Sequence, residues 1–534
     1  MSDGARPRVA TPGDADSSGS PRSASTSRAQ TAAGDVTPGP EAPPLSADQK
    51  TRQAFRQLFP GVMVAMFLAS ADQTILASAL PVIASRLGGL AYVSWVVVGY
   101  LLAATIAAPL YGHLGDRFGR KRMLLVALAI FTAASIACAG APTLLALIVA
   151  RALQGLGGGG LMTLAQALIG EHVAPRDRGR YQGYFAAVFA LASTSGPILG
   201  AYLTEHVSWR AVFAINLPLG VLAGALAWRI PQAAPVRVGR YQPDVVGIAL
   251  FCIATLGLLV TMSSAGHALA FGAWPLYALI AGVAALYVAL YAWEARSDHP
   301  IIPVRLLARA EIARPDGVVM CFAATLFATV LYLPLYLQVG RGLSVGASGT
   351  LLLPVTLAMV SGATLTGRLV SCTGKVTVFP VIGLGLATTA LLALGLMLTA
   401  LPTAVVMVLT GVLGFGLGMV MPAMQVAVQH AAGRESLGAA IGAMSLCRSV
   451  GGAIGVAVVG AIVFASIGGD DGALGSVLAR VMDAGPESLA LVSNADRAAL
   501  VAQLDRTFRM VFLCIAVVTA GGTALAWTVP GPKL

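Results

Sequence analysis

The stretch that decides the fold is Gly112-His113-Leu114-Gly115-Asp116-Arg117-Phe118-Gly119-Arg120-Lys121-Arg122, which lies between two long apolar runs. Only 11% of the chain is charged, so this cluster of one acid and several cations stands out. Charges at this density do not cross lipid, and the stretch is predicted to be an interfacial turn between two membrane helices. Its glycines allow two helix ends to approach closely, and Asp116 can form ion pairs and helix-end contacts that break again.

The composition places the chain among membrane proteins. Hydrophobic residues make up 57% of it and the mean hydropathy is +0.81, far above the range of soluble domains. A helix needs about 20 apolar residues to cross the bilayer core. By that measure the chain is an all-α polytopic membrane protein with fourteen spans, and twelve is the alternative count. The predicted spans are 59–83, 94–112, 123–141, 143–169, 183–204, 210–230, 245–264, 272–293, 316–338, 348–370, 377–399, 403–427, 438–465 and 508–529.

The net charge of +11 suggests nucleic acid as a partner, but the placement of the charges argues against it. With the N-terminus in the cytoplasm, the cytoplasmic segments hold 25 of the 34 Lys and Arg residues and the outer loops hold 7. This is the bias that orients membrane proteins, so both termini are predicted to be cytoplasmic.

Two segments outside the spans are polar. Residues 1–57 are rich in Ser, Pro, Ala, Thr and Gly, contain no apolar signal-peptide core, and are predicted to form a disordered cytoplasmic tail. The segment from about 466 to 507 is predicted to be a long outer loop of unassigned purpose. The six cysteines lack metal-ligand spacing and lie in spans or at a cytoplasmic end, so neither a disulfide nor a metal site is expected.

A weaker copy of the opening stretch occurs in the second half of the chain. Gly367 to Lys375 (GRLVSCTGK) aligns with Gly112 to Arg120 and keeps Gly, Leu, Gly and a final cation. A chance match is the alternative, but the span count favours duplication of a six-helix unit, as in rocking transporters. The predicted organisation is a six-helix bundle over 58–230, two inserted helices over 245–293 and a second six-helix bundle over 316–529.

The sequence contains no machinery for ATP hydrolysis. Gly374-Lys375 lacks the upstream glycine and the following Ser or Thr of a phosphate-binding loop, and no large soluble domain is present. The chain is therefore predicted not to be an enzyme and to need no cofactor, with an ion or substrate gradient as the driving force.

Charges inside predicted spans are candidate coupling residues. Asp72 lies in the middle of the first span, where burial favours its protonated form, and this makes it the best proton carrier in the chain. Arg151 lies in the fourth span and needs a carboxylate, carbonyl or water partner. A structural hydrogen-bonding role for Asp72 and a snorkelling side chain for Arg151 are the alternatives, and Arg448 presents the same choice. Asp316 is expected at a helix end.

Other residues in the spans have both a functional and a structural interpretation. Gly196-Pro197 in the fifth span removes a backbone donor and is expected to bend the helix. Tyr100, Tyr332 and Gln338 can line a cavity for an amphipathic ligand, although aromatic belts at the membrane interface are the common explanation for such tyrosines.

Several motifs occur together in the order of a known family. They are Asp72-Gln73-Thr74-Ile75 with Ala79-Leu80-Pro81, the Gly112–Arg122 stretch, Arg151 with Gln154 and Gly155, Gly196-Pro197 with Gly200, and Ser208-Trp209-Arg210 with Phe213, Asn216, Pro218 and Gly220. Over about 58–529 the chain resembles the fourteen-helix drug:proton antiporter group of the major facilitator superfamily. It departs from the usual pattern at Ala201, where a second glycine is usual in the fifth-helix motif.

The resemblance implies alternating access between two bundles in the cytoplasmic membrane, with a small molecule, protons and the lipid bilayer as partners. It implies proton coupling through Asp72 and Arg151, and it adds Gln73 and Asn216 to the candidate substrate-binding residues. The implied gating residues are Gly112, Asp116, Arg117, Gly119, Arg120, Gly196 and Pro197.

The predicted function is proton-coupled export of amphipathic small molecules or drugs. A dedicated exporter or importer of one metabolite, siderophore or lipid is the alternative, and a non-transporting sensor is a third class. Whether a periplasmic adaptor takes part is left open.

Overall fold

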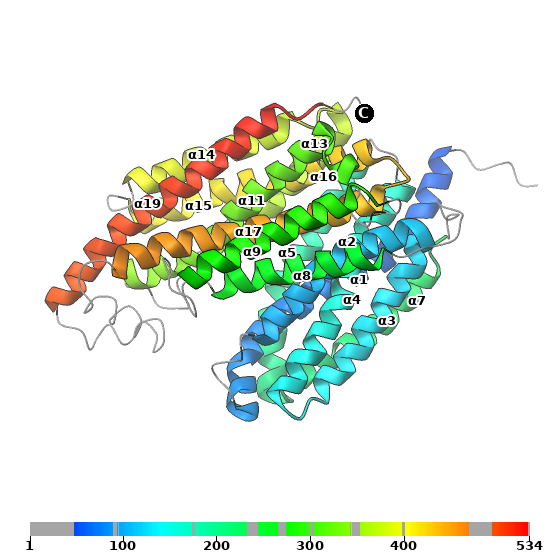
Figure 1. Cartoon of the computed structure of the whole chain (residues 1–534), viewed down its shortest axis with the longest axis horizontal. Coiled ribbons are helices and arrows are strands. Elements are labelled where there is room, and N and C mark those ends of the chain that lie inside the picture. Colours follow the sequence, from blue (N-terminus) through cyan, green and yellow to red (C-terminus); the bar gives the residue numbers. More distant parts are fainter. Residues whose placement is uncertain are drawn as a thin grey trace, which may run out of the picture. The chain divides into compact units, whose positions relative to one another are not determined.

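The computed structural model describes residues 47–88, 93, 95–173, 177–231, 244–264, 274–297, 300, 304–341, 343, 353–397, 401–468 and 494–531. Within these residues, thirteen helices are long and apolar enough to cross a membrane (Figure 1). The predicted span at 245–264 is a helix as well, but its apolar part, Val245–Leu258, is counted among the shorter ones. The all-helical membrane fold is therefore confirmed, whereas the count of fourteen spans stays a prediction.

The first half of the chain forms a bundle around α4. Helix α1 packs against α4, α5 and α7, while α4 also packs against α2 and α3. The sixth predicted span is divided at Ile215 into the short helix α6 and the helix α7. The bounds are α1 Ala47–Leu87, α2 Trp95–Phe118, α3 Arg120–Ala139, α4 Leu144–His172, α5 Arg178–His206, α6 Ala211–Ala214 and α7 Asn216–Trp228.

The second half repeats these pairings. The α1–α5, α2–α4 and α3–α7 pairs of the first half correspond to α11–α17, α13–α15 and α14–α19 in the second. The same pattern of helix pairs therefore occurs in both halves, as a duplicated unit would give. The bounds are α10 Val304–Leu307, α11 Ala310–Leu335, the π-helix η2 Tyr336–Gly340, α13 Leu353–Thr373, α14 Val378–Met397, α15 Thr403–Gly418, α16 Val420–Ala432, α17 Leu437–Gly468 and α19 Asn494–Trp527.

Helices α8 (Val245–Ser264) and α9 (Trp274–Glu294) form the inserted pair. They pack against each other, and α8 also touches α2 of the first half and α17 of the second. Asp244 joins their ends. Its carboxylate accepts hydrogen bonds from the Gly247 backbone N–H at 2.8 Å, the Trp293 indole Nε1 at 2.9 Å and the Ser297 hydroxyl at 2.8 Å.

Two predicted polar segments lie largely outside the described residues. Residues 1–46 of the predicted tail are outside them, and α1 already begins at Ala47. The first residues of the predicted outer loop belong to α17, which ends at Gly468, and its last residues belong to α19, which begins at Asn494. The residues between these helices are not described.

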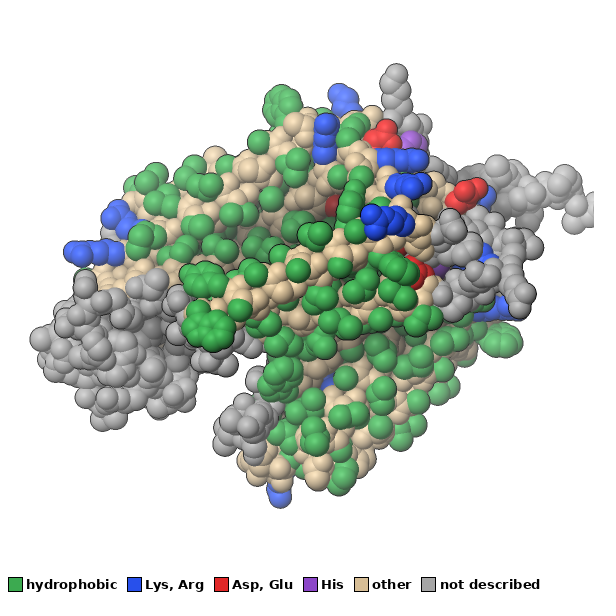
Figure 2. All heavy atoms as spheres, in the orientation of Figure 1, with side chains coloured by type: hydrophobic (Ala, Val, Ile, Leu, Met, Phe, Trp, Pro, Cys, Tyr) green, Lys and Arg blue, Asp and Glu red, His purple; other side chains and the backbone are tan. Residues whose placement is uncertain are grey.

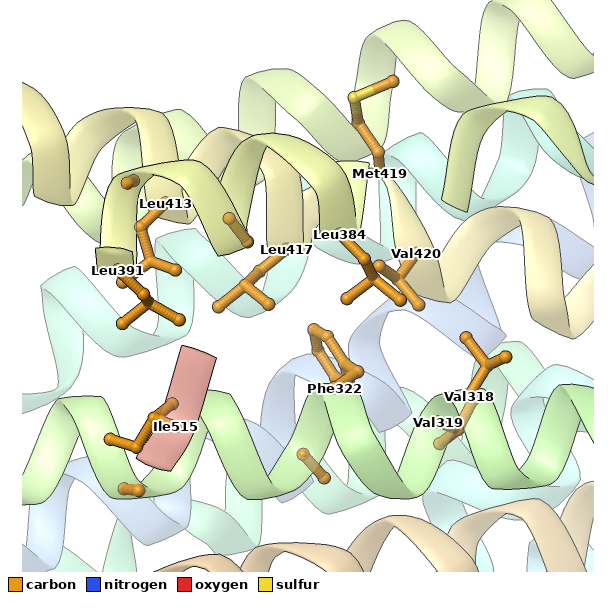
Figure 3. Packing of buried hydrophobic residues seen from close by; sticks show 14 of the residues in the cluster. Val318, Val319, Phe322, Leu384, Leu391, Leu413, Leu417, Met419, Val420 and Ile515 are labelled. Atoms are coloured by element: carbon orange, nitrogen blue, oxygen red, sulfur yellow. The ribbon is translucent and has the colours of Figure 1, made fainter. Parts of the chain in front are cut away.

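Apolar packing fills each half separately. In the second half, Phe322 points from α11 toward Leu384 of α14 and Val420 of α16 (Figure 3). On the face shown in Figure 2, hydrophobic side chains cover the helices along their length, as expected for surfaces that meet lipid. Ala167, Leu437 and Ile441 form a small buried cluster that joins α4 of the first half to α17 of the second.

Candidate coupling site, gate and opening

A buried ion pair lies in the middle of the first bundle. Asp72 on α1 is 2% exposed and Arg151 on α4 is 1% exposed. The Arg151 Nη1 donates to the Asp72 Oδ2 at 2.5 Å. Two amides complete the shell around the Asp72 Oδ1, since the Gln154 Nε2 donates to it at 2.9 Å and the Asn216 Nδ2 at 2.7 Å.

The polar shell extends one layer further. The Gln154 Nε2 also donates to the Ser135 hydroxyl at 2.8 Å, and that hydroxyl donates to the Phe131 carbonyl at 2.8 Å. Four helices, α1, α3, α4 and α7, therefore supply the side chains around one carboxylate. A buried polar network costs free energy when some of its hydrogen bonds are missing. The complete network therefore favours the one helix arrangement in which all of these bonds form.

Arg151 is fixed on its other sides as well. Its Nε donates to the Val96 carbonyl at 3.3 Å, and its guanidinium lies 4.3 Å from the centre of the Tyr100 ring. Glycines make this possible, because a Cβ on Gly155 or Gly158 of α4 would collide with Tyr100 of α2. The close α2–α4 contact thus places Tyr100 against the guanidinium.

This geometry makes the Asp72 carboxylate the counter-charge of a buried cation. Arg151 keeps its proton, so the carboxylate is the group of the pair that can change charge. Neutralising Asp72 removes the attraction that holds Arg151, and it leaves a buried cation to find another partner. The pair therefore needs an ionised Asp72, because a neutral carboxyl group carries no charge to balance Arg151.

A second polar cluster joins the two halves at the end that carries the Gly112–Arg122 stretch, here called the loop end. Asp116 on α2 accepts from the backbone N–H of Gly438 and of Ala439, each at 3.0 Å. These donors belong to the first turn of α17, where backbone N–H groups lack partners within the helix and the dipole favours an anion. Asp116 therefore stabilises the N-terminus of a helix in the opposite half.

Arg120 extends this cluster. Its Nη2 donates to the Asp116 Oδ1 at 2.7 Å and to the Arg434 carbonyl at 3.0 Å, and its Nη1 lies 3.1 Å from the Glu171 Oε2. We call Asp116, Arg120, Glu171, Gly438 and Ala439 the Asp116 latch. It contacts both halves, so opening the loop end must break it.

Each copy of the repeated stretch contacts a glycine of the opposite half. A Cβ on Gly112 would collide with the carbonyl of Gly438, and one on Gly367 would collide with that of Gly179. Ser371 occupies the position of Asp116 in the second copy, and its hydroxyl accepts from the Arg180 backbone N–H at 3.0 Å. The loop end thus has two latches related by the repeat, one charged and one neutral.

One face of α4 shows where the halves meet and where they part. Toward the loop end this face is buried, with Ala167 against Leu437 and Ile441. The same stripe continues outward at helical spacing through Leu156, Leu153, Val149 and Leu145, whose exposed fractions run from 36% to 71%. The halves therefore touch at the loop end, and toward the opposite end the stripe of α4 that faces α17 is uncovered; we call this uncovered side the opening.

The predicted residues fall into three regions. Asp72, Arg151, Tyr100 and Asn216 meet in the buried network, where Asn216 contacts Asp72 directly. Gln73 is exposed next to them, and the Tyr332 hydroxyl donates to the Val456 carbonyl at 3.3 Å. Gln338 lies in η2, and its side chain is not described. Their predicted roles remain predictions.

The predicted gating residues do not all lie together. Gly112, Asp116 and Arg120 are in the contact between the halves, Arg117 is partly exposed beside them, and Gly119 joins α2 to α3 at a φ of 95° that favours glycine. Gly196 instead packs against Thr74 of α1, and Pro197 is exposed on α5, which continues without a break from Arg178 to His206.

Three important residues carry weak signals in the sequence. Glu171 and Ser135 each lie near other polar residues and do not stand out in the sequence. Nothing there pairs Glu171 with Arg120 or Ser135 with Gln154. Asp316, expected at a helix end, is 5% exposed on the second turn of α11, with its Oδ1 lacking a hydrogen-bond partner.

Comparisons with known proteins agree on the family. The family model described as Major Facilitator Superfamily matches residues 62–456. The chain is 33% identical over 477 residues to the uncharacterised MFS-type transporter Rv1877 of Mycobacterium tuberculosis, covering 88% of this chain and 68% of that protein. It is 31% identical over 413 residues to the multidrug transporter protein MdtP of Bacillus subtilis, covering 77% and 76%.

Solved structures show the same fold. The human organic anion transporter MFSD10 superimposes with a TM-score of 0.59 at 16% identity, over 87% of this chain and 99% of that one. The proton:xylose symporter XylE superimposes with a TM-score of 0.56 at 13% identity, over 90% and 97%. The chain therefore belongs to the major facilitator superfamily, and it is a multi-pass membrane transporter of small molecules rather than an enzyme.

Proposed function

We propose that this protein is a proton-coupled antiporter of the fourteen-helix drug:proton group, which exports amphipathic small molecules across the cytoplasmic membrane. The observation that carries the proposal is the buried Asp72–Arg151 pair, in which proton binding and ion pairing exclude each other. The name of the MdtP relative supports multidrug substrates. The distribution of Lys and Arg supports a cytoplasmic loop end and cytoplasmic termini.

The proposed cycle uses the two clusters in turn. With the loop end in the cytoplasm, the Asp116 latch closes the cytoplasmic side of the cycle's first state and the opening faces outward. Substrate leaves outward and a proton reaches Asp72, which releases Arg151. The rearranged first bundle then separates from α17, so the latch breaks and the cytoplasmic side opens. New substrate then binds from the cytoplasm, and Asp72 loses its proton to that side. The Asp72–Arg151 ion pair forms again. The proton gradient alone drives this cycle, with no bound cofactor.

The proposal is tested by comparing how wild type and Asp72→Asn accumulate dye against its concentration gradient. The assay is uptake of rhodamine 6G, a cation, and sulforhodamine B, an anion, into energised everted membrane vesicles. Wild type should accumulate at least one dye, and a protonophore should abolish that accumulation. Asp72→Asn should lose it as well but still exchange dye across the membrane without a gradient, because only the coupling group is changed.

The matched control is Asp177→Asn, which makes the same chemical change at an exposed residue preceding α5. It should transport like wild type. Accumulation that survives both the protonophore and Asp72→Asn would remove proton coupling from the proposal.

A further inference from the structure

A second arginine lies deep in the molecule without the partners that Arg151 has. Arg448 on α17 is packed in the interior, yet part of its side chain remains accessible. Among the residues that the structure describes, no acid forms an ion pair with it and no acceptor forms a hydrogen bond with it. The guanidinium of Arg448 therefore has donors that no described residue uses.

The helix geometry places Arg448 at the floor of the opening. It follows Leu437 and Ile441 on the α17 stripe that packs against α4, and seven residues separate it from Ile441, about 10 Å of helix rise. Moving the same seven residues along α4 from Ala167, away from the loop end, leads to Gly160. One turn further is Leu156, the first exposed residue of the α4 stripe. Arg448 therefore lies where the two halves begin to part.

Its neighbours fit a ligand site. Ser449 accepts a hydrogen bond from the Thr105 hydroxyl of α2 at 3.4 Å, which joins the halves next to Arg448. One turn further along α17, Gly452 packs against the ring of Phe327, which is 44% exposed. A cation with an accessible aromatic ring one turn away matches a ligand with an anionic head and an apolar body.

The acids on four neighbouring helices form no ion pair with Arg448. On α4, Arg151 is paired with Asp72 and Glu171 with Arg120, and on α2 Asp116 is held in the latch. On α11, Glu311 and Arg314 lie at the loop end, and Asp316 lies near Cys447, the residue before Arg448 on α17. His430 ends α16 at the loop end.

We infer that Arg448 binds the anionic group of the substrate, so the transported class is amphipathic organic anions, such as aromatic carboxylates or sulfonates. This inference rests on the proposed function and narrows its substrate class. A lipophilic cation meets an unneutralised positive charge at the floor of the opening, whereas an anion forms charge-assisted hydrogen bonds with the guanidinium.

The test compares the two dyes, which share a xanthene ring system and differ in net charge. In everted vesicles, wild type should accumulate sulforhodamine B faster than rhodamine 6G. Arg448→Gln should raise the KM for sulforhodamine B about ten- to hundredfold and leave or improve that for rhodamine 6G. Arg448→Lys should fall between them, because it keeps the charge but loses the planar donor fork.

The control and the contrary results are specific. Arg509→Gln makes the same change at an exposed arginine of α19 and should leave both dyes unaffected. Equal loss of both dyes in Arg448→Gln, or its rescue by Asp316→Asn, would show a structural role and overturn the inference. Faster accumulation of rhodamine 6G by wild type would also overturn it.

A binding measurement separates this inference from the proposed function. Fluorescence polarisation of sulforhodamine B with purified protein in nanodiscs needs no proton gradient. Binding that weakens in Arg448→Gln supports the anion site even when Asp72→Asn vesicles show no coupling defect. Equal binding by wild type and Arg448→Gln refutes the anion site even when proton-driven transport is established.

Discussion

At the scale of single residues, the buried Asp72–Arg151 pair is costly to break. Removing one partner of a buried pair leaves an uncompensated charge, which costs about 3–5 kcal/mol. Arg151→Gln should therefore lower the melting temperature of the purified protein, and Asp72→Asn combined with Arg151→Gln should recover part of the loss. A double-mutant cycle of thermal unfolding measures this coupling. Additive effects of the two changes would contradict the pairing.

The sequence predicts these two residues but not their shell. A charge inside an apolar run is visible in one dimension, so Asp72 and Arg151 stand out. Asn216 is singled out only by the family resemblance, as a substrate-binding residue, and Ser135 not at all; only the packing of α3 and α7 against α1 and α4 places them beside the carboxylate. Arg120 and Glu171 are paired by the end of α4, which no local pattern reveals.

At the scale of helices, Asp244 fastens the inserted pair. Burial alone would raise the pKa of Asp244, but hydrogen bonds from the Gly247 N–H, Trp293 and Ser297 lower it below the usual value. A lowered pKa means that the stabilisation is present above the unfolded-state pKa of about 3.9 and is lost as the pH falls through the folded-state pKa.

The ends of α8 and α9 should therefore separate only in strong acid. Emission from Trp293, with the other tryptophans replaced by Phe, should shift to the red with a midpoint below pH 3.9. Asp244→Asn should remove this transition. A midpoint above the usual Asp value would contradict the hydrogen-bonded geometry.

The glycine contact between α2 and α17 sets how closely the loop end can close. Gly112→Val places a side chain against the Gly438 backbone, so the closed state should become less populated. Maleimide labelling of Ala167→Cys in a cysteine-free background reports this, because Ala167 is fully buried at the contact. Labelling should accelerate in Gly112→Val and stay slow in Gly385→Val, where an added Cβ meets nothing within 4 Å. Equally slow labelling in both variants would exclude a gating role for Gly112.

Helix positions are the level that the sequence predicts best. Hydropathy places the spans because each must cross the same apolar layer, and the fourth predicted span, 143–169, lies close to α4 at Leu144–His172. Breaks inside spans are not visible in this way. The interruptions at Ile215 and Met419 come from backbone geometry within runs that remain apolar.

At the scale of the whole molecule, the two latches are unequal although the repeat relates them. A hydrogen bond to a charged group contributes about 1.5–3 kcal/mol and a neutral one about 0.5–1.5 kcal/mol. Asp116→Asn should therefore speed labelling of Ala167→Cys far more than Ser371→Ala does. Equal effects of the two substitutions would show that the halves close through packing alone.

The exposed outer part of the α4 stripe has a pharmacological consequence. With the loop end in the cytoplasm, as proposed, the accessible path to Arg448 starts outside the cell. A blocker aimed at this path needs no ability to enter the cell, so a permanently charged, membrane-impermeant aromatic sulfonate is a suitable starting scaffold. Such a compound reaches its target without crossing the membrane that holds the transporter.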